Sequence, residues 1–156
     1  MTFNNPSNDR YFEDYVEGEV HRFGSISVEA DEMIAFARRF DPQTFHTDPD
    51  AAKLTPFGGL IASGWHTAGL TMRLFVEHYL THVASLASPG LDELRWLIPV
   101  RPDDTLSVRV TVLKSTPSKS KPDRGAVTSL VEVFNQVDDV VMTFKCVNII
   151  GRRPAL

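Results

Sequence analysis

A long apolar segment, from Leu60 to about Ala84, limits the folds that are open to this chain. Its apolar residues fall on nearly every face of a helix, which is typical of a helix that is buried in a core or wrapped by a sheet. A helix over the whole segment would be roughly 35 Å long. The run is broken by Trp65-His66-Thr67, Arg73 and Glu77, so we do not expect it to span a membrane.

A strand and a short helix are predicted before this segment. Residues 20–27 have the composition of a strand, and Ser27 is a suitable N-cap for a helix that has acidic residues in its first turn. Pro42 disfavours helical backbone at Asp41, so the helix should end there. The apolar stripe of this helix, spaced i, i+3, i+4 and i+7, consists of Met33, Phe36, Ala37 and Phe40.

The C-terminal half of the chain is predicted to form a series of strands. Apolar and polar residues alternate from Leu106 to Val112, which is the period of a half-buried strand. We expect the other strands at 91–100, at 126–137 and around Met142, Phe144 and Cys146, with a break at 85–90, a polar loop at 114–125 and a turn at Asp138-Asp139. A helix followed by antiparallel strands predicts an α+β fold with an antiparallel sheet.

Composition limits the function classes. The 156 residues suffice for one domain, which we place at 11–156 after a flexible polar tail at 1–10. A formal charge of −4 argues against a general nucleic-acid binder. The start of the chain does not resemble a signal peptide, so we expect a cytoplasmic protein without a membrane partner. The single cysteine, Cys146, excludes an internal disulfide and a Cys-rich zinc site.

Asp41 and His46 lie five residues apart, across a proline and just after the predicted helix. A carboxylate and an imidazole on a short turn can exchange protons with one substrate, which is general acid–base chemistry. The negative end of the helix dipole and partial desolvation would both raise the pKa of Asp41. The structural alternative is a helix end followed by an ordinary polar loop.

A glycine-rich segment, Gly58 to Gly64, leads into the apolar helix. The first N–H groups of a helix lack partners within it, so the N–H of Gly64 is a candidate donor to a developing oxyanion. Alternatively, Gly64 only permits close packing. Ser63 and His66 do not form a serine hydrolase site, because the Gly-x-Ser-x-Gly elbow is missing.

Two further clusters have ordinary explanations beside their functional ones. A metal site at His46, Asp48 and Asp50 is disfavoured, because no second histidine lies nearby and Asp-Pro-Asp is a common start of a short helix. We therefore expect no metal. The basic residues Lys114, Lys119, Lys121 and Arg124 either approach the phosphates of coenzyme A or form a solvated hairpin tip.

Three of these segments, in this order, resemble the MaoC-like dehydratases, which include the (R)-specific enoyl-CoA hydratases. They are Asp41 to His46, Gly58 to Gly64, and the Pro99-Val100-Arg101-Pro102-Asp103-Asp104-Thr105-Leu106 stretch. The resemblance covers roughly residues 12 to 150. It departs from the family at Gln43, where the family has Asn, and at Thr44, where it has Pro. It implies a hotdog fold, a curved sheet wrapped around a long central helix.

The resemblance also implies a reaction, the reversible hydration of a trans-2-enoyl-CoA or a related enoyl thioester. Water would lie between Asp41 and His46, one of which removes its proton while the other protonates the α-carbon, and the Gly64 N–H would polarise the thioester carbonyl. Coenzyme A enters as part of the substrate, and no separate cofactor is expected. The candidate substrate-binding residues are Gln43, Phe45, Phe57, Ser63 and Trp65.

Two other functions stay open at this point, a hotdog acyl-CoA thioesterase and a non-catalytic acyl-thioester binding module. The departures at Gln43 and Thr44 make the binding module more plausible. A single sheet of about five strands leaves an edge uncovered, so we expect a homodimer or a larger even assembly.

Overall fold

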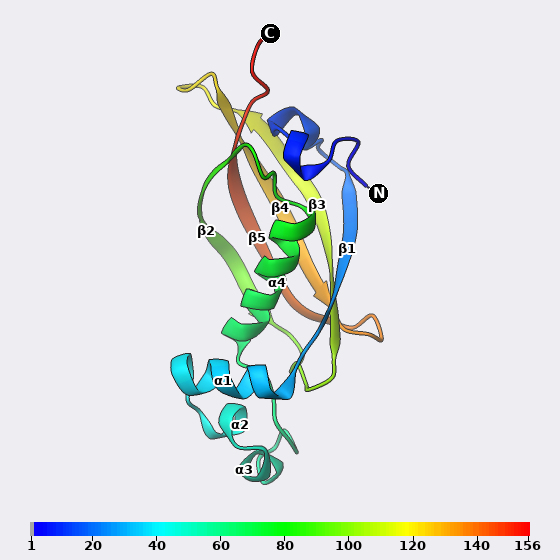
Figure 1. The fold of residues 1–156 in the computed structure, drawn as a ribbon, viewed down its shortest axis with the longest axis vertical. Coiled ribbons are helices and arrows are strands. Elements are labelled where there is room, and N and C mark those ends of the chain that lie inside the picture. Colours follow the sequence, from blue (N-terminus) through cyan, green and yellow to red (C-terminus); the bar gives the residue numbers. More distant parts are fainter. Residues whose placement is uncertain (1) are drawn as a thin grey trace.

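The computed structural model describes residues 2–156 of the chain, and it confirms the predicted α+β class. In Figure 1 the helix α4 (Gly64–His78) lies along one face of the sheet, and three shorter helices gather at one end of it. The strands are β1 (Val20–Ser27), β2 (Ser85–Trp96), β3 (Thr105–Pro117), β4 (Arg124–Phe134) and β5 (Val140–Gly151). The remaining elements are the 3₁₀ turns η1 (Ser7–Asp9) and η2 (Phe12–Asp14) and the helices α1 (Ala30–Phe40), α2 (Thr44–Thr47) and α3 (Pro49–Lys53).

The five strands form one antiparallel sheet in the order β1-β3-β4-β5-β2. The alternation predicted for β3 is confirmed, since Val108 and Val110 are fully buried and pair with Val133 and Val131 of β4. In β5, Met142, Phe144 and Cys146 are buried as well. The core therefore lies between this face of the sheet and α4.

The central helix is shorter than the apolar segment that contains it, so the prediction of a helix over 60–84 is wrong at both ends. The N-terminal part is extended, and Ala62 donates its backbone N–H to Val100 O, which fastens the segment to the loop after β2. At the other end Tyr79 and Leu80 are buried although they lie outside the helix. A buried segment is apolar whether or not it is helical, so hydrophobicity did not mark the helix ends.

Strand β2 begins six residues earlier than the start predicted at Leu91, and the expected break at 85–90 is part of it. Its register against β5 shifts on both sides of Ala87 and again after Asp92, and Gly90 has φ 151°, a value that favours glycine. Nearly every residue of β2 is exposed because β5 is its only strand neighbour in the described chain. It is one of the two edge strands of the sheet, and β1 is the other.

Several other boundaries differ from the prediction. The expected loop at 114–125 is narrower, since β3 continues to Pro117 and β4 begins at Arg124. Glu29, and not Ser27, occupies the N-cap position of α1. Phe40, the last residue of the predicted apolar stripe, is 60% exposed. The turn at Asp138-Asp139 is confirmed: Asp138 has φ 62° and its N–H donates to Asn135 O.

The segment before Tyr11 contacts the rest of the domain through Phe3 and Arg10; Met1 lies outside the described residues. Arg10 is only 5% exposed, and its guanidinium donates to His78 O and Tyr79 O at the end of α4. Its charged group also lies 3.6 Å from the centre of the Phe3 ring. A cation on the last carbonyls stabilises a helix end, so this segment caps the central helix. Within residues 2–156, no helix is long and apolar enough to cross a membrane.

Candidate active site

Asp41 is placed by the end of α1. Its backbone N–H still donates to Ala37 O, but its ψ of 68° takes the chain out of the helix before Pro42, as predicted. The chain then re-enters one short helical turn, α2, which carries His46. The side chains of Asp41 and His46 therefore meet at the junction of α1 and α2, with Asp41 Oδ2 3.3 Å from His46 Nε2.

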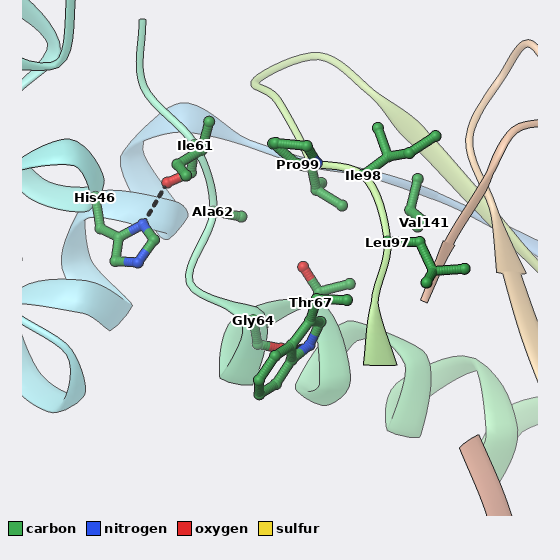
Figure 2. A pocket seen from close by; sticks show the side chains of 11 residues that line it. His46, Ile61, Ala62, Gly64, Thr67, Leu97, Ile98, Pro99 and Val141 are labelled. Carbon is green, nitrogen blue, oxygen red and sulfur yellow. Dashed lines mark hydrogen bonds between the residues drawn. The ribbon is translucent and has the colours of Figure 1, made fainter. Parts of the chain in front are cut away.

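Hydrogen bonds fix the tautomer of His46. Its Nδ1 lies 2.7 Å from Ile61 O, and because a carbonyl can only accept, Nδ1 carries the proton. Figure 2 shows this hydrogen bond between the imidazole and the segment that precedes α4. In a neutral imidazole Nε2 is then a lone pair that faces Asp41. His46 is 6% exposed, so its ring is held within the protein with one basic nitrogen directed at the carboxylate.

Asp41 accepts two side-chain hydrogen bonds. Gln43 Nε2 donates to Oδ1 over 2.7 Å, and Ser63 Oγ donates to Oδ2 over 2.8 Å. The hydrogen bond from Gln43 lowers the pKa of Asp41; burial opposes it, while Ser63 and the nearby His46 add to the lowering. The predicted rise in the pKa of Asp41 is therefore wrong, because hydrogen-bond donors outweigh desolvation at this carboxylate.

Gly64 is the first residue of α4, and Ser63 is its N-cap. The N–H of Gly64 has no acceptor one turn earlier in the helix, which leaves it as a donor at the positive end of the helix dipole. The indole of Trp96 covers Gly64 closely, and its Nε1–H donates to Gly64 O over 3.0 Å. A side chain at this position would overlap the Trp96 ring, so close packing also requires glycine here.

A cavity of about 200 Å³ joins His46 to Gly64. Figure 2 shows its walls: the extended segment with Ile61 and Ala62 lies between His46 and the first turn of α4, and Pro99 and Ile98 lie opposite. The lining is mainly apolar; besides His46 and Gly64 it includes Thr67, Trp96, Val100 and Val141. This cavity has room for the reacting part of an acyl chain.

The predicted substrate-binding residues do not line this cavity. Gln43 and Ser63 contact Asp41 instead, and Ser63 is fully buried. Phe45 packs edge-on against His46 and tilted against Phe57. Trp65 is exposed and contacts Trp96. Trp96 and Thr67 line the cavity but were not predicted to do so. The only signal for them in the sequence is that they lie close to the motifs at Pro99 and Gly64.

The other clusters lie apart from the pair. Asp48 caps α3, since its Oδ1 accepts from the N–H groups of Asp50 and Ala51. Among the described residues, no group of three or more His, Cys, Asp or Glu side chains is arranged to hold a metal ion. The hairpin between β3 and β4, which carries Lys119 and Lys121, lies at the opposite end of the sheet from α1 and α2 (Figure 1). Within one chain it is remote from Asp41.

The site consists of a carboxylate and an imidazole at the junction of α1 and α2, next to the start of a helix that lies along one face of an antiparallel sheet. The family described as MaoC like domain matches residues 12–134, so the chain belongs to the MaoC-like dehydratase family, and its fold is the hotdog fold. This confirms the resemblance at the level of the family.

Individual proteins agree with this assignment. The chain is 32% identical over 124 residues to the Uncharacterized protein YdeM of Bacillus subtilis (strain 168), a match that covers 80% of this chain and 86% of YdeM. The crystal structure of the MaoC-like dehydratase from Rhodospirillum rubrum has a TM-score of 0.86 and 44% identity, over 94% of this chain and 99% of that one. An (R)-hydratase from A. caviae involved in PHA biosynthesis has a TM-score of 0.68 and 25% identity, over 89% and 97% of the two chains.

Proposed function

We propose that this protein catalyses the reversible addition of water to a trans-2-enoyl thioester of coenzyme A, forming the 3-hydroxyacyl thioester. The observation that carries the proposal is the pair of acceptors at the junction of α1 and α2, Asp41 Oδ2 and His46 Nε2, 3.3 Å apart. Family membership supports a hydro-lyase, and the likeness to the (R)-hydratase from A. caviae supports the substrate class.

Two acceptors 3.3 Å apart leave no room for a molecule between them, so they need a hydrogen donor that lies beside both. A water molecule meets this need, since it can donate one hydrogen to each atom. Its oxygen is then held with the lone pairs directed away from the pair, toward a substrate. Because the pKa of Asp41 is lowered, its carboxylate is ionised over a wide range of pH and holds the water without removing its proton.

His46 is then the base of the proposed reaction. Its Nε2 takes one proton from the water as the oxygen bonds to the β-carbon, and the Asp41 carboxylate stabilises the imidazolium that forms. The electrons of the double bond move onto the thioester oxygen, which accepts a hydrogen bond from the Gly64 N–H. The enolate is finally protonated at the α-carbon by the same imidazolium, so both additions occur on one face. Hydroxyl and hydrogen are added, and His46 returns to its neutral form.

Gln43 has a role in this scheme despite its departure from the family. Its amide donates to Asp41 Oδ1, the oxygen that does not face His46. It therefore orients the carboxylate so that Oδ2 meets both His46 and Ser63. The substitution of Asn by Gln keeps the amide donor, which supports catalysis over mere binding.

We also propose that two copies associate through the edge at β2. Large apolar side chains are exposed along this strand and the segment after it, including Leu86, Leu91, Trp96 and Leu97. Met72 and Val76 of α4 are exposed beside them. An unpaired strand edge next to an apolar surface is removed from water when a second copy pairs with it. Trp96 and Leu97 also line the cavity at Gly64, so the proposed interface would lie next to this cavity.

A panel of trans-2-enoyl-CoA substrates, followed at once by loss of enoyl absorbance and by thiol release, tests the proposed reaction. Hydration removes the conjugated absorbance without releasing thiol. Thiol release would identify a thioesterase, and binding without either change would identify a non-catalytic module.

A further inference from the structure

Trp96 is the last residue of the edge strand β2, and it lies over the start of α4. Its indole Nε1–H donates to Gly64 O over 3.0 Å, and its ring occupies the space in which a Cβ of residue 64 would lie. A tryptophan that is 46% exposed buries only part of its apolar surface, so burial alone does not account for this side chain. Its hydrogen bond goes to the residue that carries the proposed oxyanion donor.

Gly64 needs such contacts, because glycine turns more freely about its backbone dihedrals than any other residue. The direction of its N–H is limited on one side by Ser63, which is fully buried and donates from Oγ to Asp41. On the other side Trp96 holds the Gly64 carbonyl and fills the space beside the Cα. The N–H and the carbonyl of one residue are separated by only two soft dihedrals, so a group that fixes the carbonyl and crowds the Cα also limits the N–H.

Trp96 also faces the cavity of the candidate site. Of the two tryptophans in the chain, Trp96 lines the cavity that joins His46 to Gly64, and Trp65 does not. Trp65 is 59% exposed and packs edge-on against Trp96 at 5.3 Å between ring centres. Its contact with Ser63 Oγ is made by the backbone N–H, which a phenylalanine variant keeps. Trp65 is therefore the matched control for Trp96.

We propose that Trp96 is a positioning residue, which holds the first residue of α4 so that the Gly64 N–H stays directed at the developing oxyanion. This inference rests on the proposed function, because the donor that Trp96 positions belongs to the same site. The negative charge on the thioester oxygen develops only in the transition state, so a misaligned donor weakens the transition state more than substrate binding. Loss of Trp96 should therefore lower kcat while KM changes little.

Two substitutions separate the hydrogen bond from the ring. Trp96→Phe keeps an aromatic ring near Gly64 but lacks the N–H, and Trp96→Leu lacks both. In the hydration of a trans-2-enoyl-CoA, Trp96→Phe should lower kcat about tenfold, less than the roughly 10²- to 10³-fold that loss of a whole oxyanion donor costs. Trp96→Leu should lower kcat further, with KM within about threefold of the wild type in both variants. Trp65→Phe should keep the kcat and KM of the wild type.

Trp96 also lies on the edge at which two copies are proposed to associate, so a loss of assembly must be distinguished from a loss of positioning. Circular dichroism checks that each variant is folded, and light scattering at the assay concentration gives its mass. The kinetic comparison is made between proteins that have the mass of the wild type.

A second measurement leaves Trp96 in place and needs no turnover. In Trp65→Phe, Trp96 is the only tryptophan, so the tryptophan emission reports on the ring that covers Gly64. A saturated acyl-CoA, which cannot be hydrated, should change this emission in a saturable way, because a thioester beside the Gly64 N–H lies against the indole.

Wild-type kcat in folded and assembled Trp96→Phe and Trp96→Leu, while the wild type hydrates the enoyl-CoA, overturns the inference and leaves the proposed function in place. A higher KM without a loss of kcat overturns it too, because Trp96 would then serve binding alone. An emission that acyl-CoA does not change, in a Trp65→Phe protein that still hydrates the enoyl-CoA, separates the ring from the reacting group and also overturns the inference. Absence of hydration by the wild type overturns the proposed function itself.

Discussion

Ser63 donates a 2.8 Å hydrogen bond from Oγ to Asp41 Oδ2, and the same oxygen accepts the backbone N–H of Trp65 at the start of α4. One hydroxyl thus connects the end of α1, which carries the acid–base pair, to the start of the helix that presents the Gly64 N–H. The relative position of the two halves of the site depends on this partly buried contact.

Ser63→Ala should therefore lower activity and shift its pH dependence. Loss of a donor raises the pKa of Asp41, so the acid limb of the activity profile should move to higher pH, because the proposed reaction needs the ionised carboxylate. Loss of the cap should cost about 1 kcal/mol of unfolding free energy. Asp48→Ala is the control: it removes the cap of α3 without touching Asp41, and its profile should stay in place. An unshifted acid limb in Ser63→Ala would remove Ser63 from the site.

Gln43→Met should change how stability depends on pH. Gln43 is the main cause of the lowered pKa of Asp41. The stability linked to a lowered carboxylate pKa is present above the unfolded value, about 3.9, and is lost as the pH falls through the folded value. The variant should thus lose less stability than the wild type on acidification through this range. Urea unfolding at a series of pH values measures it, and parallel curves for the two proteins would contradict it.

Gly64→Ala should damage packing as well as chemistry. The added methyl overlaps the Trp96 ring, and overpacking of this kind costs about 1–3 kcal/mol. The double variant Gly64→Ala/Trp96→Ala removes the ring that the methyl overlaps, so it should recover part of the stability that Gly64→Ala loses. Thermal unfolding of both single variants and the double variant gives the comparison. A Gly64→Ala protein as stable as the wild type would show that the Trp96 ring can move away from the added methyl at no cost in unfolding free energy.

If two copies associate at β2, a charge introduced at that edge should weaken the association. Leu91→Lys places an ammonium group on the exposed apolar edge and should shift the protein toward monomers in light scattering. Val137→Lys, on the even more exposed turn between β4 and β5, should leave the assembly unchanged. A wild-type monomer at micromolar concentration would rule out the association itself.

The sequence predicts the alternating strand β3 and the end of α1 well, because both depend on local pattern. Alternation in β3 reflects one buried face, and Pro42 ends α1 by its own geometry. The limits of α4 do not follow from pattern, since Tyr79 and Leu80 are buried outside the helix. The predicted start of β2 is too late for a related reason. Pro89 and Gly90 usually indicate a break, but a bulged edge strand tolerates both residues.

In the site, sequence reasoning identified the chemical groups but not their neighbours. The hydrogen bond between Ser63 and Asp41 joins residues 22 positions apart, and that contact arises only when α1 packs beside α4. The rise predicted for the pKa of Asp41 failed for this reason, because it omitted the donors that the fold supplies. The packing of the Trp96 ring on Gly64 likewise depends on the pairing of β2 with β5.

The most direct measurement of the central claim is the hydration of trans-2-enoyl-CoA by the wild type, Asp41→Asn, His46→Gln and the control Asp48→Ala, each confirmed as folded by circular dichroism. The wild type and Asp48→Ala should consume the enoyl absorbance without releasing thiol. Asp41→Asn and His46→Gln should each lose about 10²- to 10⁴-fold in rate, the usual contribution of a general acid–base group. Hydration by folded Asp41→Asn at more than about a tenth of the wild-type rate, far above the loss expected for such a group, would contradict the assignment of the Asp41–His46 pair.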